Sequence, residues 1–351
     1  MYSNNTNYQN ELAQYVKNLP VLNSYSGKTV IVTGCCGLIG TYIVDLLMKK
    51  NEIDNAKIRV IGIDFSLERE TERFSEYHSS PYYRFILHNV NLPLEYIGED
   101  ADYIIHAASN TSPINYGQKP VETISANVIG TYMLLEYAKT YNIKRFLFCS
   151  SVEIYGQNRG DIEDFNEAYS GYIDCNTARA CYPAGKRAAE AMCASYYSEY
   201  NVEYVTARIG RYFGPTVIMG DTKAPTQFIM NGLNKENIIM KSSGTQMFSW
   251  GYVGDCAAGL LFMLIKGKAG EVYNIADPTS KAMLKEFSGC VSEAAGTKLE
   301  FIEQNSKELA GYSKITKATL DVSKLESLGY KSTYNYKEGI KKTLEYLSSQ
   351  K

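Results

Sequence analysis

The sequence lacks the features that mark several classes of protein. Its net charge is only −2, so nothing favours binding to nucleic acid or to an anionic membrane surface. No stretch approaches the roughly 18 consecutive apolar residues of a membrane span, and the polar residues 1–10 lack the layout of a signal peptide. We therefore expect no nucleic-acid partner, no membrane partner and a cytoplasmic location.

Signs of metal and disulfide chemistry are also missing. Only three histidines occur, and no cysteine and histidine cluster has the spacing of a metal site, so no metal is expected. The eight cysteines show no paired spacing, which in a chain of 351 residues is typical of reduced cytosolic thiols. Tyrosine, in contrast, is abundant at 30 residues, which indicates either a polar substrate cleft or the compositional bias of the source.

A glycine-rich turn follows the first predicted strand. Residues 28–33 are rich in β-branched side chains, as expected of a buried strand, and a helix is predicted from the turn to about Lys50. Glycines let the backbone approach a pyrophosphate, and the free N–H groups of a helix N-terminus bind it. The spacing is G-x-x-G-x-x-G, not G-x-G-x-x-G. The predicted dinucleotide-binding turn comprises Gly34, Gly37, Leu38, Ile39 and Gly40.

An acidic residue ends the second predicted strand, at 58–63. Asp64 is placed to accept hydrogen bonds from the ribose hydroxyls of an adenosine, and its carboxylate would repel a 2′-phosphate. This position predicts NAD, and not NADP, as the cofactor. The alternative is that Asp64 only caps a helix or closes a turn.

Strands and helices then alternate through most of the chain. Strands are predicted at 83–87, 103–106, 145–149, 202–209 and 270–275, and helices at 121–141, 283–295 and 336–347. The alternation predicts an α/β fold with a Rossmann-type doubly wound parallel sheet, in which ligands bind beyond the carboxyl ends of the strands. Further candidate cofactor contacts lie at these ends: Asn89, Val90, Ala107, Ala108, Ser109 and Ser150.

The same pattern predicts how the chain is divided. A polar lead with a short helix precedes the cofactor domain, and a smaller C-terminal α/β domain binds the substrate. The predicted ranges are 1–27 for the lead with its helix at 11–19, 28–210 plus about 249–275 for the NAD-binding Rossmann domain, and 211–248 with 276–351 for the substrate-binding domain.

A tyrosine and a lysine four positions apart open the helix predicted to run towards Tyr200. One helical turn brings Tyr182 and Lys186 to the same face, and a nearby ammonium favours the phenolate because an opposite charge lowers the pKa of the phenol. Such a tyrosine can exchange a proton at neutral pH. Pro183 is welcome only in a first helical turn, and it pushes Tyr182 towards an extended conformation, so we expect Tyr182 at the mouth of the helix and not inside it.

Taken together, these elements resemble a known family. The resemblance rests on the segments 33–40 and 182–186, with Asp64, Asn127 and Ser151 in order between them. They are similar to the extended short-chain dehydrogenase/reductases that act on nucleotide sugars, and the similarity covers nearly the whole chain. The stretches 110–116, 179–187 and 226–229 look most like the branch of UDP-glucuronate decarboxylases and dTDP-glucose 4,6-dehydratases.

The resemblance implies a role for each of these residues. Tyr182 would be the base that takes the proton of the substrate hydroxyl, and Lys186 would hydrogen-bond the ribose of NAD and lower the tyrosine pKa. Ser151 would hydrogen-bond the reacting oxygen. Asn127 would take part in a proton relay below the site, or it is simply a buried structural asparagine. Asn89 would accept a hydrogen bond from the adenine amino group through its amide oxygen.

Several positions depart from the family pattern. Dehydratases carry an Asp-Glu pair where this chain has Val152-Glu153, and valine cannot donate a proton. Glu153 is left as a base or as a hydrogen-bond partner of the substrate, unless it is only a paired structural carboxylate. Decarboxylases carry an arginine at the position matching Phe248, whereas Arg211 stands where relatives place an asparagine near the diphosphate. Arg211 either replaces the missing cation or pairs with a structural carboxylate. The predicted substrate contacts are Arg211, Lys223, Gln227 and Tyr252.

The implied activity is NAD-dependent oxidation of C4 of a nucleotide-activated sugar to a keto intermediate. Epimerisation is the first expectation, because it needs the fewest catalytic groups beyond Ser151, Tyr182 and Lys186. The alternative is net reduction or oxidation of a nucleotide-linked keto sugar. Decarboxylation and 4,6-dehydration rank lower, as does a non-catalytic NAD-binding module.

The resemblance also implies a homodimer. In the family, two helices of each subunit, here 121–141 and 183–200, pack into a four-helix bundle. Ala188, Met192 and Tyr196 recur at helical spacing and either serve that interface or face the sheet.

Overall fold

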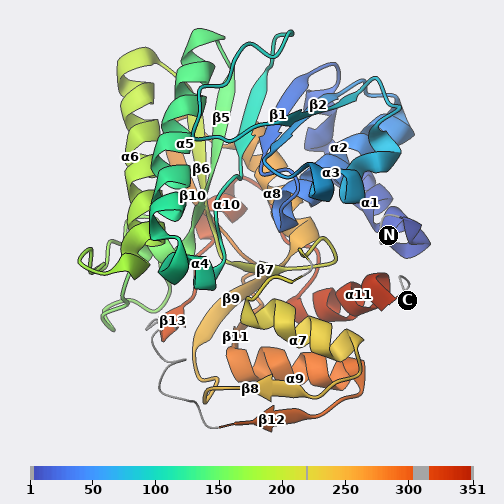
Figure 1. Cartoon of the computed structure of the whole chain (residues 1–351), viewed down its shortest axis with the longest axis vertical. Helices are drawn as coiled ribbons and strands as arrows, with labels where there is room; N and C mark the ends of the chain where they lie inside the picture. Colours follow the sequence, from blue (N-terminus) through green and yellow to red (C-terminus); the bar gives the residue numbers. More distant parts are fainter. Residues whose placement is uncertain (1–3, 219, 303–315, 349–351) are drawn as a thin grey trace.

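A seven-stranded parallel sheet forms the centre of the molecule (Figure 1). The computed structural model describes residues 4–218, 220–302 and 316–348. The strand order is β10-β6-β5-β4-β1-β2-β3. The strands span Thr29–Thr33 (β1), Arg59–Asp64 (β2), Tyr83–Leu87 (β3), Tyr103–His106 (β4), Arg145–Ser151 (β5), Tyr204–Ile209 (β6) and Glu271–Ile275 (β10). The predicted Rossmann-type doubly wound sheet is therefore confirmed.

The apolar runs of the central strands explain why they are buried on both faces. All five residues of β1 are buried, and consecutive side chains point to opposite faces of the sheet. Val30 and Val32 join one apolar cluster, and Ile31 between them joins a second cluster on the other side. The order of the strands reverses between β1 and β4, so a crevice for ligands is expected at their carboxyl ends.

Helices cover both faces of this sheet. On one side α5 and α6 pack against each other, and on the other side α2 packs against α8 (Figure 1). The helices around the sheet are α2 (Leu38–Asp54), α3 (Leu67–Phe74), α4 (Pro113–Gln118), α5 (Pro120–Thr140), α6 (Cys181–Tyr200), α8 (Val253–Lys266) and α10 (Ser323–Ser327), with the short 3-10 helices η3 (Ser75–Tyr77), η4 (Val152–Tyr155) and η5 (Ala178–Ala180).

The N-terminal lead is more ordered than its polar composition predicts. Its helix α1 (Thr6–Asn18) begins earlier than expected, because Asn5 accepts hydrogen bonds from the N–H groups of Asn7 and Tyr8 and so caps the helix. A 3-10 helix, η2 (Pro20–Tyr25), follows. α1 packs on α2 and brings a buried Glu11 into the core of the molecule.

Tyrosine hydroxyls surround that buried carboxylate. Tyr42, Tyr252 and Tyr346 donate to Glu11, and Lys342 forms an ion pair with it at 3.1 Å. These partners come from three separate elements of the fold, α2, β9 and α11. Part of the tyrosine abundance therefore serves the packing of the interior, a reason that composition alone does not reveal.

A smaller α/β region follows the central sheet and lies below it in Figure 1. Its mixed sheet contains β7 (Arg211–Phe213), β9 (Met247–Tyr252), β11 (Lys281–Met283) and β13 (Lys317–Ala318), and a separate pair joins β8 (Ile238–Met240) to β12 (Leu299–Phe301). Helices α7 (Ala224–Leu233), α9 (Leu284–Ala295) and α11 (Tyr336–Ser348) pack together beside it. Although residues 211–215 interrupt the alternation, the first three form a strand against β9.

All eight cysteines carry free thiols, as their spacing predicts. In the ranges that the structure describes, none of the helices combines the length and apolarity needed to span a bilayer.

Candidate functional site

The glycine turn brings the start of α2 against the end of β4. Gly34 has a φ of +69°, and a Cβ there would lie 2.7 Å from the Cα of Ala108, so only glycine fits. A Cβ on Gly40 would lie 2.3 Å from the carbonyl oxygen of Gly34. The N-cap of α2 is Gly37, and no side chain caps its first turn. The turn therefore presents free N–H groups at a helix N-terminus, a cradle that suits a pyrophosphate.

Asp64 lies next to this cradle at the end of β2. Its Oδ2 accepts from the N–H of Cys36 at 3.1 Å and its Oδ1 from the N–H of Phe65 at 2.8 Å. Burial raises the pKa of the Asp64 carboxyl, and these backbone hydrogen bonds oppose the rise. Each carboxylate oxygen keeps a further lone pair, so the group can close this turn and still accept from ribose hydroxyls. The residues present thus fit a dinucleotide.

Further predicted contacts follow at the neighbouring strand ends. Val90 is buried, whereas Asn89 is exposed and its Oδ1 accepts from the N–H of Asn91. Ala107 and Ala108 follow β4, where the backbone of the glycine turn meets them.

Ser109 and Asn127 are bonded to each other. The Ser109 hydroxyl donates to Asn127 Oδ1 at 2.9 Å, and Asn127 Nδ2 donates to the carbonyl of Thr123. Asn127 is fully buried, so its side chain ties the end of β4 to α5. These contacts give Asn127 a structural role, while its part in a proton relay stays a prediction.

Tyr182, Ser151 and Lys186 meet at the carboxyl end of β5. Pro183 lies in the first turn of α6, as expected, but Tyr182 is already the second residue of that helix and not outside it, because the helix begins at Cys181. A side-chain hydrogen bond joins Tyr182 to Ser151. Lys186 donates to the carbonyl oxygen of Cys149 at 2.7 Å, and its Nζ lies 6.0 Å from the centre of the Tyr182 ring.

The electrostatics of this group differ in one respect from the expectation. Burial raises the pKa of the Tyr182 phenol, and the Glu153 carboxylate raises it further. The hydrogen bond with Ser151 and the charge of Arg179 lower the pKa of Tyr182. Burial lowers the pKa of the Lys186 ammonium to about 8. The cation that opposes the rise at Tyr182 is therefore Arg179, which the motif did not single out.

Three neighbours of Tyr182 form a stack that the sequence motif does not reveal. The ring of Tyr116 lies on that of Tyr182, with centroids 4.9 Å apart and planes at 21°. The Arg179 guanidinium lies 4.6 Å from the centre of the Tyr116 ring and forms an ion pair with Glu153 at 2.6 Å. Tyr116 and Arg179 were not predicted as site residues, although both belong to two of the three stretches that look most like the family, which is the one signal that could have found them.

A second ion pair, between Glu190 and Arg208, ties the middle of α6 to the central sheet. The Ser150 hydroxyl donates to Glu190 of α6, and Arg208 of β6 binds both carboxylate oxygens of Glu190. Ser150, expected to contact the cofactor, thus has its hydroxyl engaged by a helix. Neither Glu190 nor Arg208 stands out in the sequence, because a buried ion pair between distant segments has no local signature.

Arg211 stands apart from the other cations. Its guanidinium carbon lies 3.6 Å from the centre of the Phe248 ring, and it makes no ion pair or hydrogen bond within the described ranges. Burial lowers the pKa of Arg211, while the Glu153 carboxylate and Tyr116 favour its charge. The alternative that Arg211 pairs with a structural carboxylate is not what the structure shows.

The remaining predicted substrate contacts divide into two groups. Lys223 is the N-cap residue of α7 and donates to Thr111 at 2.8 Å and to Asp221. Gln227 lies in the first turns of α7 and donates to the backbone carbonyl of Asp221, so both side chains hold the loop before that helix. Tyr252 is not brought together with them: its side chain is fully buried and its hydroxyl donates to Glu11. We therefore do not retain Tyr252 as a substrate contact.

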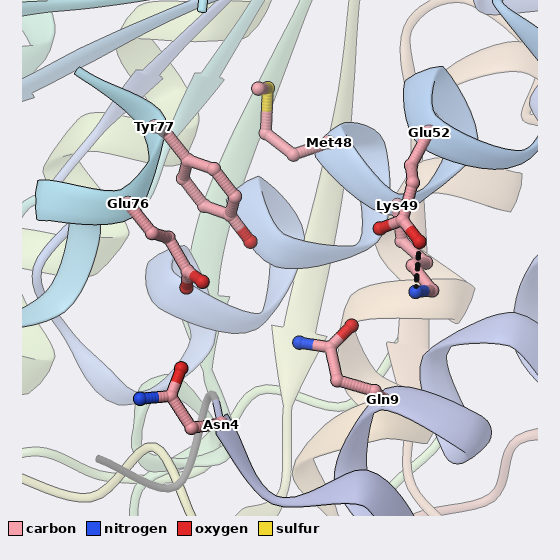
Figure 2. A pocket seen from close by; sticks show the side chains of 7 residues that line it. All are labelled: Asn4, Gln9, Met48, Lys49, Glu52, Glu76 and Tyr77. Atoms are coloured by element: carbon pink, nitrogen blue, oxygen red, sulfur yellow. Dashed lines mark hydrogen bonds and ion pairs between the residues drawn. The ribbon is translucent and has the colours of Figure 1, made fainter. Parts of the chain in front are cut away.

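A separate hollow lies between α1, α2 and η3. Figure 2 shows Gln9, Lys49, Glu52 and Tyr77 around it, with Lys49 paired to Glu52. Its volume is about 380 Å³, and none of the predicted site residues lines it. It is therefore distinct from the site at the strand ends.

The chain is similar over most of its length to known proteins. The model of the NAD dependent epimerase/dehydratase family matches residues 30–276. UDP-glucuronic acid decarboxylase 5 of Arabidopsis thaliana is 31% identical over 327 residues, covering 92% of this chain and 90% of its own. UDP-glucuronic acid decarboxylase 1 of Danio rerio is 31% identical over 333 residues, covering 94% and 75%.

Solved structures confirm the fold. A UDP-glucuronic acid 4-epimerase from Bacillus cereus, crystallised with UDP-glucuronic acid and NAD, has a TM-score of 0.78 at 21% identity and covers 92% of this chain and 100% of its own. A UDP-N-acetylglucosamine 4-epimerase from Methanobrevibacter ruminantium M1 has a TM-score of 0.79 at 23% identity, covering 92% and 99%. The chain belongs to the NAD dependent epimerase/dehydratase family, and it is an NAD-dependent enzyme of that family.

Proposed function

We propose that this enzyme oxidises C4 of a nucleotide-activated sugar and then reduces the ketone again, so that the net reaction is an epimerisation. The observation that carries the proposal is the meeting of Ser151, Tyr182 and Lys186 at the end of β5 and the start of α6. The relatives support the class of substrate, because their names place them on UDP-glucuronic acid. Epimerisation needs no catalytic group beyond these three.

Each of the three side chains has a distinct part. Bound NAD would supply the acceptor, and later the donor, of the hydride that leaves the sugar carbon. Tyr182 takes the proton of the sugar hydroxyl, and Ser151 hydrogen-bonds the same oxygen and holds it near the phenol. Lys186 would turn from the Cys149 carbonyl to the cofactor ribose, where its positive charge favours the phenolate.

The cofactor contacts follow the strand ends. The glycine turn would hold the pyrophosphate and Asp64 the adenosine ribose, both argued from the geometry above. Asn89 and Val90 would lie near the adenine. The remaining proposed contacts are Ala107, Ala108, Ser109 and Ser150.

The neighbours of Tyr182 bear on what happens after the oxidation. Val152 is buried and apolar, so it cannot protonate a leaving hydroxyl, and a 4,6-dehydration of the usual kind is disfavoured. Glu153 is paired with Arg179 and acts as a hydrogen-bond acceptor for a sugar hydroxyl.

The substrate anion is held by Arg211. The resemblance places an arginine of the relatives at Phe248, and here the guanidinium of Arg211 reaches the face of the Phe248 ring from the next strand. A cation that makes no ion pair in the described ranges suits a substrate phosphate or carboxylate, which a guanidinium binds bidentately. The position of the charge is thus retained although the residue that supplies it differs.

This position favours a second candidate function, the decarboxylation of a nucleotide-linked uronate. Phenylalanine at 248 argues against binding a uronate carboxylate, but Arg211 over its ring removes that objection. Oxidation of C4 through Tyr182 is common to both reactions. They differ in the fate of the keto sugar.

Product analysis separates these outcomes. The purified enzyme is incubated with UDP-, dTDP-, CDP- and GDP-linked sugars, including UDP-glucuronic acid, with and without added NADH, and the products are identified by mass spectrometry. Epimerisation leaves the mass unchanged and needs no NADH, decarboxylation loses carbon dioxide, and net reduction consumes NADH. The Tyr182→Phe variant is the control and should lose all three. If no reaction yields an isomer with the same mass as its substrate, the first proposal is refuted.

A variant pair tests Arg211. We expect Arg211→Asn to weaken UDP binding about tenfold to a hundredfold in calorimetric titration, since a charge-assisted contact is lost. Arg211→Asn combined with Phe248→Arg should recover part of the affinity by supplying the guanidinium from the neighbouring strand. Lys268→Gln, an exposed cation, is the matched control. Unchanged affinity in Arg211→Asn would refute the assignment.

The partner we propose is a second copy of this chain. α5 and α6 pack side by side, and apolar side chains of α5 face outward: Val121, Ile124 and Tyr132 are all more than a third exposed. Ala188 on α6 is exposed as well, whereas Tyr196 is buried and donates to Glu136, so Tyr196 serves the packing of α5 on α6. A four-helix interface would cover the exposed apolar residues.

A further inference from the structure

Tyr182 belongs to a continuous stack of side chains from four elements. Its ring lies against Tyr116 of α4, whose other neighbour is the guanidinium of Arg179 from η5. Arg179 in turn holds the carboxylate of Glu153 from η4 at 2.6 Å. Tyr116 and Tyr182 are both more than nine-tenths buried, so water does not screen these contacts well.

We propose that Arg179 is a positioning residue for Tyr182, which holds the Tyr116–Tyr182 ring stack in place and neutralises the Glu153 carboxylate beside the phenol. The proposal rests on the proposed function, because it concerns the proton transfer through Tyr182. It extends that function to a residue that does not touch the reacting atoms.

The geometry explains why one cation does both tasks. A guanidinium is planar, so it lies flat on an aromatic ring and still donates in its own plane to a carboxylate. The guanidinium of Arg179 lies over the Tyr116 ring while its Nη2 donates to Glu153. An ammonium would form the ion pair but would not cover the ring in the same way.

Glu153 needs this partner because of where the chain places it. The Ser151 hydroxyl accepts a hydrogen bond from the N–H of Glu153 at 3.2 Å, which fixes the glutamate backbone next to the predicted catalytic serine. An unpaired carboxylate at this position would oppose the formation of a phenolate at Tyr182, because like charges repel. In agreement, Glu153 raises the pKa of Tyr182 and Arg179 lowers it.

Other titratable groups lie around the Tyr182 phenol besides Arg179 and Glu153. Lys186 donates to a backbone carbonyl and is common to every variant described below. Cys149 and Tyr116 are buried, and burial raises the pKa of both, so both stay neutral near pH 7. The titratable or charged groups described around Tyr182 are Glu153, Arg179, Tyr116, Cys149, Cys181 and Lys186, with Arg211 near Glu153 and Tyr116. Burial also raises the pKa of the Cys181 thiol, and Arg211 is common to every variant.

Four variants separate positioning from simple structural support. Arg179→Gln leaves the Glu153 charge unpaired, Glu153→Gln removes that charge, and the double variant removes both. Arg179→Lys keeps the charge without the flat contact on Tyr116. For each protein the pH dependence of NADH formation is measured after mixing the enzyme–NAD complex with the sugar nucleotide that the panel identifies as substrate.

We expect opposite shifts that cancel. The pH midpoint of the rising limb should move up by about one unit in Arg179→Gln, a rate loss of about tenfold at neutral pH that vanishes at high pH. It should move down in Glu153→Gln and return close to that of the parent in the double variant. Arg179→Lys should shift less than Arg179→Gln. An equal rate loss at every pH, or a double variant worse than both single ones, would overturn the proposal.

A second measurement does not depend on turnover. The tyrosinate absorbance of each enzyme–NAD complex is titrated against that of the same protein carrying Tyr182→Phe, so the difference isolates Tyr182. The order of midpoints should again be Glu153→Gln, then the parent and the double variant, then Arg179→Gln. An Arg179→Gln variant indistinguishable from the parent refutes the positioning role. If the parent titrates as expected but converts no sugar nucleotide, the proposed function fails and this inference does not.

Discussion

Replacing Glu11 by leucine removes the buried carboxylate of the N-terminal helix α1, which accepts three hydrogen bonds from tyrosines. Glu11 is 2% exposed, and its two oxygens accept from Tyr42 and Tyr252 at 2.6 Å each and from Tyr346 at 2.9 Å. All three rings are buried, so their hydroxyls cannot turn to water when the acceptor is removed.

The expected loss of stability can be worked from these contacts. Each buried hydroxyl left without an acceptor costs about 1 to 2 kcal/mol, so three cost about 3 to 6 kcal/mol. Lys342 adds little, because its side chain is 26% exposed and its ammonium can be hydrated instead. Removing the buried carboxylate also relieves its own desolvation, which lowers the total. We expect Glu11→Leu to reduce the free energy of unfolding by about 3 kcal/mol.

Urea unfolding followed by tryptophan fluorescence measures this loss. The single tryptophan, Trp250, is buried in β9 and stacks on Phe287 with ring centroids 4.2 Å apart, so it reports on the same strand that carries Tyr252. Glu52→Gln, which alters an exposed pair with Lys49, is the control and should change stability by less than about 0.5 kcal/mol. A Glu11→Leu protein as stable as this control would refute the reasoning.

Three further outcomes are expected. Burial raises the pKa of Asp45 to about 7, so the folded protein binds a proton at Asp45 that the unfolded protein releases above about pH 4. The stability that this proton contributes is complete below the unfolded pKa and is lost as the pH rises through about 7. Urea midpoints should therefore fall from about pH 5 to about pH 8 in the parent, and fall less in Asp45→Asn. Gly34→Ala should abolish NAD binding in calorimetry, because φ is +69° and the added Cβ meets Ala108, whereas Gly289→Ala, which has open space around it, should bind NAD normally. Val121→Asp should convert the proposed dimer to a monomer in sedimentation velocity, and an unchanged sedimentation coefficient would contradict the α5/α6 interface.

Local patterns account for most of the central sheet. A run of buried β-branched residues, a glycine turn and an amphipathic helix are short-range signals, because backbone sterics and side-chain periodicity act within a few residues. They predicted β1, the turn after it and the start of α6 at Tyr182. They did not predict β7, because a three-residue strand carries too little pattern, or the early start of α1, whose signal is the single capping residue Asn5.

The candidate site shows the same division. The spacing of Tyr182 and Lys186 placed these two on one helix face, and the family resemblance predicted that Ser151 shares their site. The three meet because strand ends and a helix start lie at one edge of a parallel sheet. The sequence left open whether Arg211 replaces the cation missing at Phe248 or pairs with a structural carboxylate. Only the structure could decide, because the contact of Arg211 with the Phe248 ring forms across β7 and β9, which are remote in sequence.

By itself the sequence determined the fold class and the cofactor, and it predicted the three side chains that we propose to react, because each depends on residues close together in the chain or on a pattern repeated along it. Only the tertiary structure decided which groups surround them. Tyr252, predicted to contact the substrate, instead donates a hydrogen bond to Glu11 in the interior. Glu153 pairs with Arg179, whose guanidinium lies over the ring of Tyr116. Contacts of this kind arise between distant segments, and their energies depend on burial, which appears only once the chain has folded.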